Sequence, residues 1–338
     1  MDQVTGKSGR KIPGWLMPAL AYALSAASLI WVFHDFDFQH TLTAVRTLNW
    51  RYVAFAVIVD LSVYLCHGWR WNILLRPVAR LSFWRTVQAI YIGLYANEIL
   101  PLRTGEVIRC YLLAHWNKVR ISIALSSAAI ERILDGIWLV IALIITTQTV
   151  ALPSGLVQAT FVLSAFILVL TSILIFIAVR QQTAPDTIPK HWRENVYWQV
   201  VAAIRTIGNR RTMLAGAGAS FVYLALQVIA LWALMEGYGL DLSIGAAAVV
   251  YIVNRLGTVI PNAPGNAGVT QVFYVLGLQL FSVPQATAKE FSFIAFVILT
   301  LPLLIGGFVA VALTGLKLHD IRLRAQSSVE SAVQAASD

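Results

Sequence analysis

Charged side chains occur inside segments of this sequence that are otherwise apolar, and they define the chemistry it could perform. Glu98, Glu106 and Arg109 flank a Pro-x-x-x-Gly break, and Glu131 and Asp135 lie four residues apart in the next apolar run. A charge at the centre of a bilayer costs about 2.5–3.5 kcal/mol on insertion scales, so such residues should face a cavity or a partner of opposite charge. We therefore expect a polar site at membrane depth. The candidate substrate-binding residues are Glu98, Arg103, Gly105, Glu106, Arg109, Glu131, Arg132, Asp135, Asn262, Gly265 and Asn266.

Two chemical interpretations of these residues stay open. In the first, the half-helix that follows each break directs its free N–H groups and positive dipole end at a cavity, and Arg103 and Arg109 complete an anion site. Phosphate is the anion that lipid headgroups supply, and Glu98 and Glu106 would bind a cationic group or orient the arginines. In the second interpretation, the arginines only neutralise the carboxylates. Asp60, in an earlier apolar run, is expected to pair with an arginine.

Catalytic motifs are not found in the sequence. It contains no His-Glu-x-x-His, no Gly-x-Ser-x-Gly and no aspartate-rich metal motif. The six histidines are scattered and are expected at the membrane interface, while Cys66 and Cys110 suggest neither a disulfide framework nor a zinc site. We expect a protein that is not an enzyme and that has no catalytic residue, cofactor or metal site.

The elements that must position the charged residues are apolar helices. Of the 338 residues, 58% are hydrophobic and 12% are charged, whereas soluble domains carry about 25% charged residues. This composition excludes a disordered chain, a secreted disulfide scaffold and nearly every class of soluble enzyme. We expect an all-α, polytopic helical membrane protein that forms a single integral membrane domain over residues 1–338, with about six full spans. The expected spans are 15–34, 52–71, 121–150, 156–179, 213–237 and 286–316.

Two further apolar stretches, 83–116 and 244–281, are each broken in the middle by Pro and Gly. Neither half of either stretch spans a membrane comfortably, so we predict two re-entrant helical hairpins; a pair of ordinary spans joined by a tight turn is the alternative. The two Pro-x-x-x-Gly breaks are offset by 160 residues, and the single span between the two units would turn the second upside down. We therefore predict an inverted-topology repeat, with repeat A at 51–150 and repeat B at 211–316, which is typical of alternating-access transporters.

Basic residues indicate how the chain lies in the membrane. The net charge is +9, and the Arg- and Lys-rich connections, Arg70 among them, fall on one side of the predicted arrangement together with both termini. The positive-inside rule makes that side the cytoplasm. We expect a multi-pass protein of the plasma (inner) membrane, with a cytoplasmic loop or amphipathic helix at 180–212 and a cytoplasmic tail at 317–338. Because the basic residues bracket apolar runs, they do not indicate a nucleic-acid partner.

Three motifs of the sequence resemble those of one family. They are Asn97-Glu-Ile-Leu-Pro-Leu-Arg-Thr-Gly-Glu-Val-Ile-Arg109, Glu131-Arg-Ile-Leu-Asp135 and Pro261-Asn-Ala-Pro-Gly-Asn-Ala-Gly268. Together they resemble the flippase-like membrane region of the lysylphosphatidylglycerol synthase/flippase family, over nearly the whole chain. The resemblance implies a region that moves lipid between leaflets. Since the segment after Lys317 is short, we expect no synthase domain, and Gln271 stands where the family has a Glu, which argues against a cationic aminoacyl headgroup.

The leading function is therefore a lipid flippase or scramblase-like transporter of a phospholipid or other phosphate-headed lipid. One alternative is a secondary transporter of a small organic anion, with Glu98, Glu106 or Asp60 carrying protons. Another is an intramembrane lipid-modifying enzyme. The expected partner is a membrane lipid with a phosphate-containing headgroup; a homo-oligomer and a separate lipid-synthesising enzyme stay open as partners.

Overall fold

The computed structural model describes residues 16–34, 36–100, 104–149, 209–258, 263–315 and 317–334, together with isolated positions between 154 and 172. Within these ranges the chain forms eleven α-helices and one 3-10 turn, and the expected all-α fold is confirmed. The helices are α1 Leu16–Phe33, α2 Phe38–Thr47, α3 Trp50–Leu75, α4 Phe83–Ile99, α5 Gly105–Asn117, α6 Ile121–Thr149, α9 Arg210–Tyr238, α10 Ile244–Gly257, α11 Val269–Gln279, α12 Gln285–Ala312 and α13 Leu318–Gln334, and the 3-10 turn η2 is Pro264–Asn266.

Several helices are built to lie in a membrane. In the described ranges α3, α9 and α12 are long and apolar enough to cross one, and α1 with α2 makes a fourth span if that pair, bent by 78°, is counted as one. Large apolar side chains such as Phe55, Phe221 and Phe308 are exposed on the outside of these helices. A surface of this kind suits a hydrocarbon solvent, so the expected polytopic helical membrane protein is confirmed.

Two of the expected spans, 121–150 and 156–179, are not among these candidate spans of the described ranges. Most of the predicted span 156–179 lies outside the described residues, and so does the predicted loop 180–212 up to residue 208, shortly before α9 begins at Arg210. α6 is 29 residues long, but it carries the acidic and basic residues of the Glu131–Asp135 motif in its middle. Its polar positions therefore need partners inside the protein.

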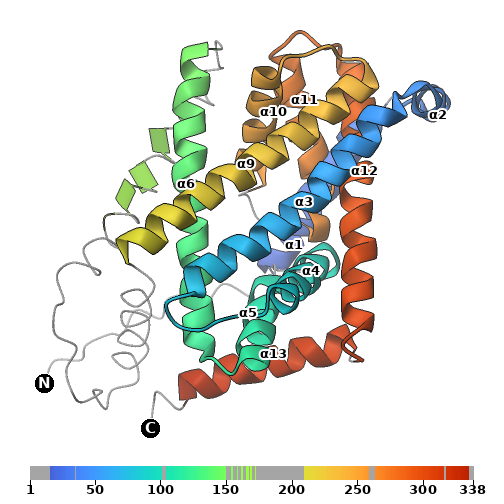
Figure 1. Ribbon diagram of the computed structural model, residues 1–338. Coiled ribbons are helices and arrows are strands. Elements are labelled where there is room, and N and C mark those ends of the chain that lie inside the picture. Colours follow the sequence, from blue (N-terminus) through green and yellow to red (C-terminus); the bar gives the residue numbers. More distant parts are fainter. Residues whose placement is uncertain are drawn as a thin grey trace, which may run out of the picture.

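α3 and α9 form the centre of the molecule and run antiparallel along one another, with α6 and α12 on either side of them (Figure 1). The backbone N–H of Asn49, just before α3, donates to the carbonyl of Gly237, near the end of α9, at 2.8 Å. Further along the pair, the thiol of Cys66 donates to the carbonyl of Ala219 at 3.8 Å. The start of each helix thus lies beside the end of the other.

The pairs α4–α5 and α10–α11 are two hairpins that open at opposite ends of the α3–α9 pair. Arg85 at the start of α4 donates to the carbonyl of Trp116 at the end of α5, at 3.5 Å, so the first hairpin begins and ends where α3 ends. Tyr238 at the end of α9 donates to Glu290 near the start of α12, at 2.9 Å, so the second hairpin begins and ends where α3 begins. α5 has 13 residues, which rise about 20 Å, less than the ~30 Å hydrocarbon core.

The two breaks differ from each other in detail. α5 begins at Gly105, as the sequence predicts. The half-helix that we expect directly after the second break does not begin at Gly265, because α11 begins only at Val269. Gly265, Asn266 and Gly268 have positive φ angles of 69°, 53° and 85°. These left-handed residues form a turn around η2, and a right-handed helix cannot start until they have passed.

The segment that follows α12 contains a helix that the sequence interpretation does not predict. α13 lies across one end of the bundle and packs against α5 and α6 (Figure 1). Ile321 and Ala325, one turn apart, are fully buried in this contact, at 0% and 1% exposed. A helix with one apolar and one polar face suits the membrane surface.

Candidate functional site

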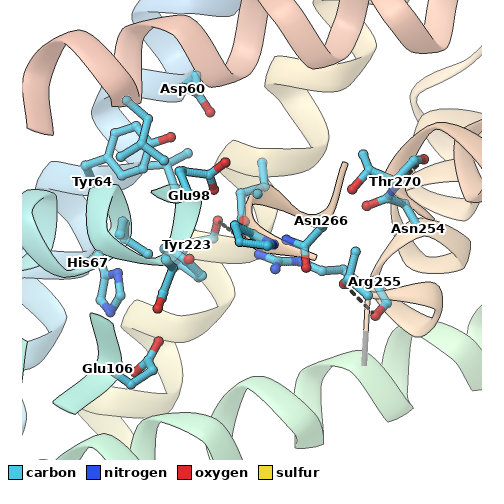
Figure 2. A pocket seen from close by; sticks show the side chains of 18 of the residues that line it. Asp60, Tyr64, His67, Glu98, Glu106, Tyr223, Asn254, Arg255, Asn266 and Thr270 are labelled. Atoms are coloured by element: carbon cyan, nitrogen blue, oxygen red, sulfur yellow. Dashed lines mark hydrogen bonds between the residues drawn. The ribbon is translucent and has the colours of Figure 1, made fainter. Parts of the chain in front are cut away.

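A polar cavity of about 260 Å³ lies where the tips of the two hairpins meet, beside α3 and α9 (Figure 2). A Cβ atom at Gly265 would lie only 2.7 Å from Oε2 of Glu98, so the second tip touches the end of α4. The polar and charged lining residues are Asp60, Tyr64, His67, Asn97, Glu98, Glu106, Arg132, Tyr223, Gln227, Asn254, Arg255, Thr258, Asn266 and Thr270. Both hairpins and both central helices therefore contribute polar groups to one space.

The N-terminus of α5 is occupied by protein groups. The backbone N–H of Gly105 donates to Oδ1 of Asn97 at 2.9 Å, and Glu106 places a carboxylate in the first turn, beside the positive end of the helix dipole. A Cβ atom at Gly105 would lie 1.8 Å from the carbonyl oxygen of Gly93. Gly105 does not line the cavity, and close packing of α5 on α4 accounts for a glycine there without any ligand.

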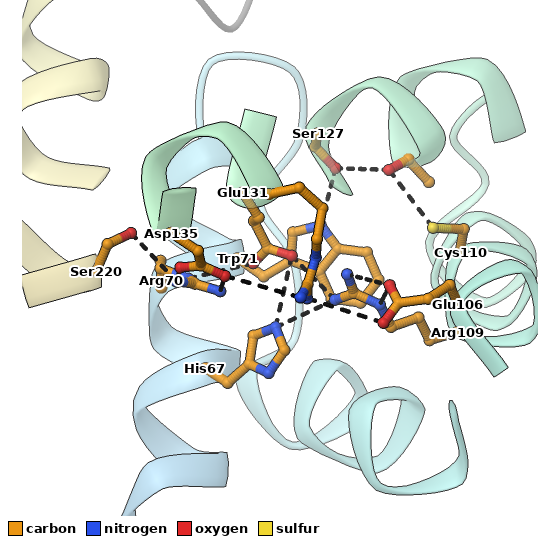
Figure 3. A network of polar contacts seen from close by, with 12 residues as sticks. His67, Arg70, Trp71, Glu106, Arg109, Cys110, Ser127, Glu131, Asp135 and Ser220 are labelled. Atoms are coloured by element: carbon orange, nitrogen blue, oxygen red, sulfur yellow. Dashed lines mark hydrogen bonds and ion pairs between the residues drawn. The ribbon is translucent and has the colours of Figure 1, made fainter. Parts of the chain in front are cut away.

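Six charged side chains of alternating sign form a closed ring beside the cavity, which we call the charge ring (Figure 3). Its members, in order, are Glu106, Arg109, Glu131, Arg70, Asp135 and Arg132. They come from α3, α5 and α6, and their formal charges sum to zero. The ring joins α3 to the two consecutive helices α5 and α6, which follow it later in the chain.

The inner half of the charge ring is completely buried. Nη1 of Arg109 donates to Oε2 of Glu131 at 2.9 Å, and Nη2 lies 2.7 Å from Oε2 of Glu106. Glu131 also faces Arg70, whose Nε lies 3.4 Å from Oε1, and Arg70 donates on to Asp135. Arg70, Arg109 and Glu131 have side chains that are 0% to 1% exposed. Arg109 and Glu131 thus neutralise each other, as the second interpretation of the sequence expects.

The outer half of the charge ring is open. The side chain of Arg132 is 52% exposed, and it lies 3.8 Å from Glu106 and 3.9 Å from Asp135. Pairs at such distances on an exposed side chain are weak. Arg132 can therefore respond to the contents of the cavity more easily than Arg109 can.

Aromatic rings cover the buried guanidinium groups. The guanidinium carbon of Arg109 lies 4.6 Å from the ring centre of Trp71, and that of Arg70 lies 4.5 Å from the ring centre of Tyr223. Trp71 is itself fixed, because its indole N–H donates to Ser127 at 2.8 Å. These cation–π contacts shield the charge ring and hold the arginines in place. Arg70, which the sequence interpretation counts among the basic residues of a connection, is instead buried inside the protein within α3.

His67 connects the charge ring with the cavity. It is 1% exposed, it lines the cavity, and its Nε2 lies 3.2 Å from Nη1 of Arg109 and 3.5 Å from Oε2 of Glu131. The ring of Tyr223 packs on its imidazole with 5.2 Å between the centroids. The expectation that each histidine lies at the membrane interface is thus wrong for His67.

Arg255 is a cavity arginine with neutral partners. Its Nε donates to the hydroxyl of Tyr251 and its Nη2 to Oε1 of Gln227. No carboxylate of the described residues forms an ion pair with it, and Asp135 acts on it only from a greater distance. A guanidinium held by neutral groups keeps its charge for an anionic ligand.

Asp60 stands at another side of the same cavity. Asp60 lies one turn before Tyr64 on α3, and its Oδ2 has no hydrogen-bond partner in the described part of the chain. The arginine that we expected beside Asp60 is not found among the described residues. Asp60 and Arg255 are thus charges of opposite sign that the cavity keeps apart (Figure 2).

The structure divides the predicted site residues into three groups. Those that line the cavity are Glu98, Glu106, Arg132, Gly265 and Asn266. Those that lie behind it are Gly105, Arg109, Glu131 and Asp135. Arg103 and Asn262 lie outside the described residues.

The sequence interpretation proposed Asp60 as a proton carrier but missed four other polar residues of the cavity, Tyr64, His67, Tyr223 and Gln227, although a signal for them exists. Asp60, Tyr64 and His67 follow one another at i, i+4 and i+7, and Tyr223 and Gln227 at i, i+4. Such a spacing places polar groups on a single face of an otherwise apolar helix. No group of three or more His, Cys, Asp or Glu in the described ranges is placed to hold a metal ion.

Long apolar helices around a charged internal cavity define a multi-pass membrane protein. The chain belongs to the family described as the lysylphosphatidylglycerol synthase TM region, whose model matches residues 19–307, and the family resemblance of the sequence motifs is confirmed. It is similar to a UPF0104 membrane protein of Methanothermobacter thermautotrophicus, with 22% identity over 295 residues that cover 82% of this chain and 86% of the relative. A UPF0104 membrane protein of Methanocaldococcus jannaschii is 21% identical over 261 residues, which cover 71% of this chain and 78% of the relative.

Proposed function

We propose that this protein moves a phosphate-containing lipid between the leaflets of the plasma membrane, as a flippase or scramblase, and that it is not an enzyme. The observation that carries this proposal is the charged cavity, lined by both hairpin tips, inside a protein whose outer surface is apolar. The cavity would hold the headgroup while the acyl chains stay in the bilayer. The family description names a phospholipid, lysylphosphatidylglycerol, which supports a lipid as the ligand.

Arg255 is the residue that we assign to the phosphate. The sequence favoured Arg109 and Arg103 for this role, but Arg109 already shares its charge with Glu106 and Glu131. Arg255 has only the neutral partners Tyr251 and Gln227 among the described residues. We therefore assign Arg109 to the scaffold, and Arg255 to the ligand.

The transport cycle that we propose uses the two hairpins as the moving parts of an inverted repeat, with repeat A at 51–150 and repeat B at 211–316. The full arrangement has about six spans, with both termini and the 180–212 segment in the cytoplasm. The first hairpin would enter the membrane from the cytoplasm and the second from outside. The antiparallel α3–α9 pair and the opposite openings of the hairpins support this arrangement, which would let the cavity open to each side in turn.

The proposal is tested with purified protein in vesicles that contain an acyl-labelled fluorescent phosphatidylglycerol or a fluorescent ceramide, which has no phosphate. Relative to protein-free vesicles, we expect the protein to accelerate the transbilayer movement of the first lipid and to leave that of the second, which crosses by itself, unchanged. Arg255→Gln should slow this movement about tenfold, and Arg255→Lys should slow it less, because Lys keeps the charge but loses the two-pronged contact with phosphate oxygens. Arg51→Gln, an exposed position at the start of α3, serves as the matched control and should behave as wild type.

Three other results would change the role assigned to Arg255 or the proposed function. Unchanged movement in Arg255→Gln would show that this residue does not hold the phosphate. Uptake of a small organic anion without any lipid movement would favour a secondary transporter. Chemical conversion of the added lipid by the protein alone would favour an intramembrane lipid-modifying enzyme.

A further inference from the structure

The imidazole of His67 has one ring nitrogen engaged by the protein and one that is not. Nε2 lies 3.2 Å from Nη1 of Arg109. Nδ1 is buried and has no hydrogen-bond partner among the described residues, and it lies on the side of the ring away from the charge ring (Figure 3). Since His67 is itself a lining residue of the cavity, Nδ1 is the nitrogen that remains for a ligand.

The neighbours of His67 determine which nitrogen carries the proton. A guanidinium only donates hydrogen bonds, so Nη1 of Arg109, at 3.2 Å, requires Nε2 to accept. The carboxylate oxygen Oε2 of Glu131, which would require Nε2 to donate, lies further away at 3.5 Å and already accepts from Arg109 at 2.9 Å, so the contact with Arg109 decides. The two N–H groups of that nitrogen serve Glu131 and His67, at 2.9 Å and 3.2 Å. With Nε2 as the acceptor, a neutral imidazole carries its proton on Nδ1.

We propose that His67 is a ligand-binding residue that donates its Nδ1–H to an acceptor oxygen of the lipid headgroup, and that the charge ring holds the imidazole in the tautomer this contact requires. The inference rests on the proposed function and adds a second, uncharged contact to that of Arg255. A buried N–H without a partner is costly and rare in proteins. A ligand oxygen in the cavity would provide the missing acceptor.

The packing around His67 makes it a rigid donor. The ring of Tyr223 lies against the imidazole, and the same ring covers Arg70 of the charge ring. With Arg109 at Nε2, the imidazole is fixed on two sides before any ligand arrives. A donor fixed in advance selects ligands that present an oxygen at one place.

Two amide substitutions separate the ligand contact from the structural contact. The amide nitrogen of Asn overlays Nδ1 of a histidine, and the amide end of Gln overlays Nε2. His67→Asn therefore keeps the donor to the cavity and removes the acceptor for Arg109, whereas His67→Gln does the reverse.

The test measures both the unfolding of the full-length protein and the movement of fluorescent phosphatidylglycerol in vesicles. We expect His67→Gln to be about as stable as wild type but to transport about tenfold more slowly, in line with the loss of one hydrogen bond from a buried donor. We expect His67→Asn to be less stable and yet to transport within about threefold of wild type. Nuclear magnetic resonance of labelled histidine should assign the proton of the His67 ring to Nδ1 and show its signal change when the phospholipid is added.

The outcomes separate this inference from the proposed function. If wild type moves no lipid, both fail. If wild type moves lipid and the transport rates of the two variants follow their stabilities, His67 is purely structural and only this inference fails. A proton found on Nε2 would also overturn it.

Discussion

Replacement of Glu131 by glutamine is the most direct perturbation of the charge ring. Glu131 is 0% exposed and faces two guanidinium groups, with Arg109 at 2.9 Å and Arg70 at 3.4 Å. Glutamine has nearly the same shape but no charge, so both arginines lose their common carboxylate. Breaking a buried ion pair by removing one partner costs about 3–5 kcal/mol, because the remaining charge stays buried without compensation. Arg109 keeps Glu106 and Arg70 keeps Asp135, but the charge ring is left with one uncompensated positive charge, so we expect Glu131→Gln to lower the free energy of unfolding by about 3–5 kcal/mol.

The measurement is equilibrium unfolding of the purified protein in mixed micelles, with increasing denaturing detergent. Asp60→Asn is the matched control, since it makes the same change from carboxylate to amide in a part of the cavity where no arginine pairs with the carboxylate among the described residues. We expect Asp60→Asn to change stability by less than about 1 kcal/mol or to raise it, because it removes a poorly compensated charge. A loss below about 1 kcal/mol for Glu131→Gln, or equal losses for both variants, would refute the reasoning.

Two further predictions concern packing and topology. Gly105→Ala should destabilise the protein by at least about 1–3 kcal/mol in the same unfolding assay, because the new Cβ would lie 1.8 Å from a backbone oxygen. Gly218→Ala, where no atom lies within 4 Å of the new Cβ, should be neutral or stabilising by up to about 1 kcal/mol; similar losses for both would contradict the packing argument. Single cysteines at Thr43 and Arg120, both exposed, should label from opposite sides of the membrane in intact cells, whereas the native cysteines are buried. Labelling of both positions from the same side would disprove the proposed topology.

The sequence alone determined the features of this protein that depend on local rules. Apolar runs of membrane length predicted the helices. The Pro-x-x-x-Gly breaks predicted the hairpins, because Pro and Gly close together interrupt a helix more strongly than the single Pro302 or the glycines inside the long helices do. The start of α5 at Gly105 and the shared face of Glu131 and Asp135, which both contact Arg70, follow from the same local geometry. The second break could not be predicted in the same way. Residues with positive φ angles around Gly265 prevent α11 from starting before Val269, and the Pro-x-x-x-Gly pattern does not indicate those φ angles.

Only the tertiary structure decided which charges compensate one another. Arg70 lies some 60 residues before its partners Glu131 and Asp135, and no pattern of spacing predicts that α3 would bring it to α6. The same packing placed Arg109 between two carboxylates and left Arg255 with neutral partners. The physical reason is that a sequence shows where charges are, whereas their energies depend on distances of a few ångströms between helices that pack far apart in the chain.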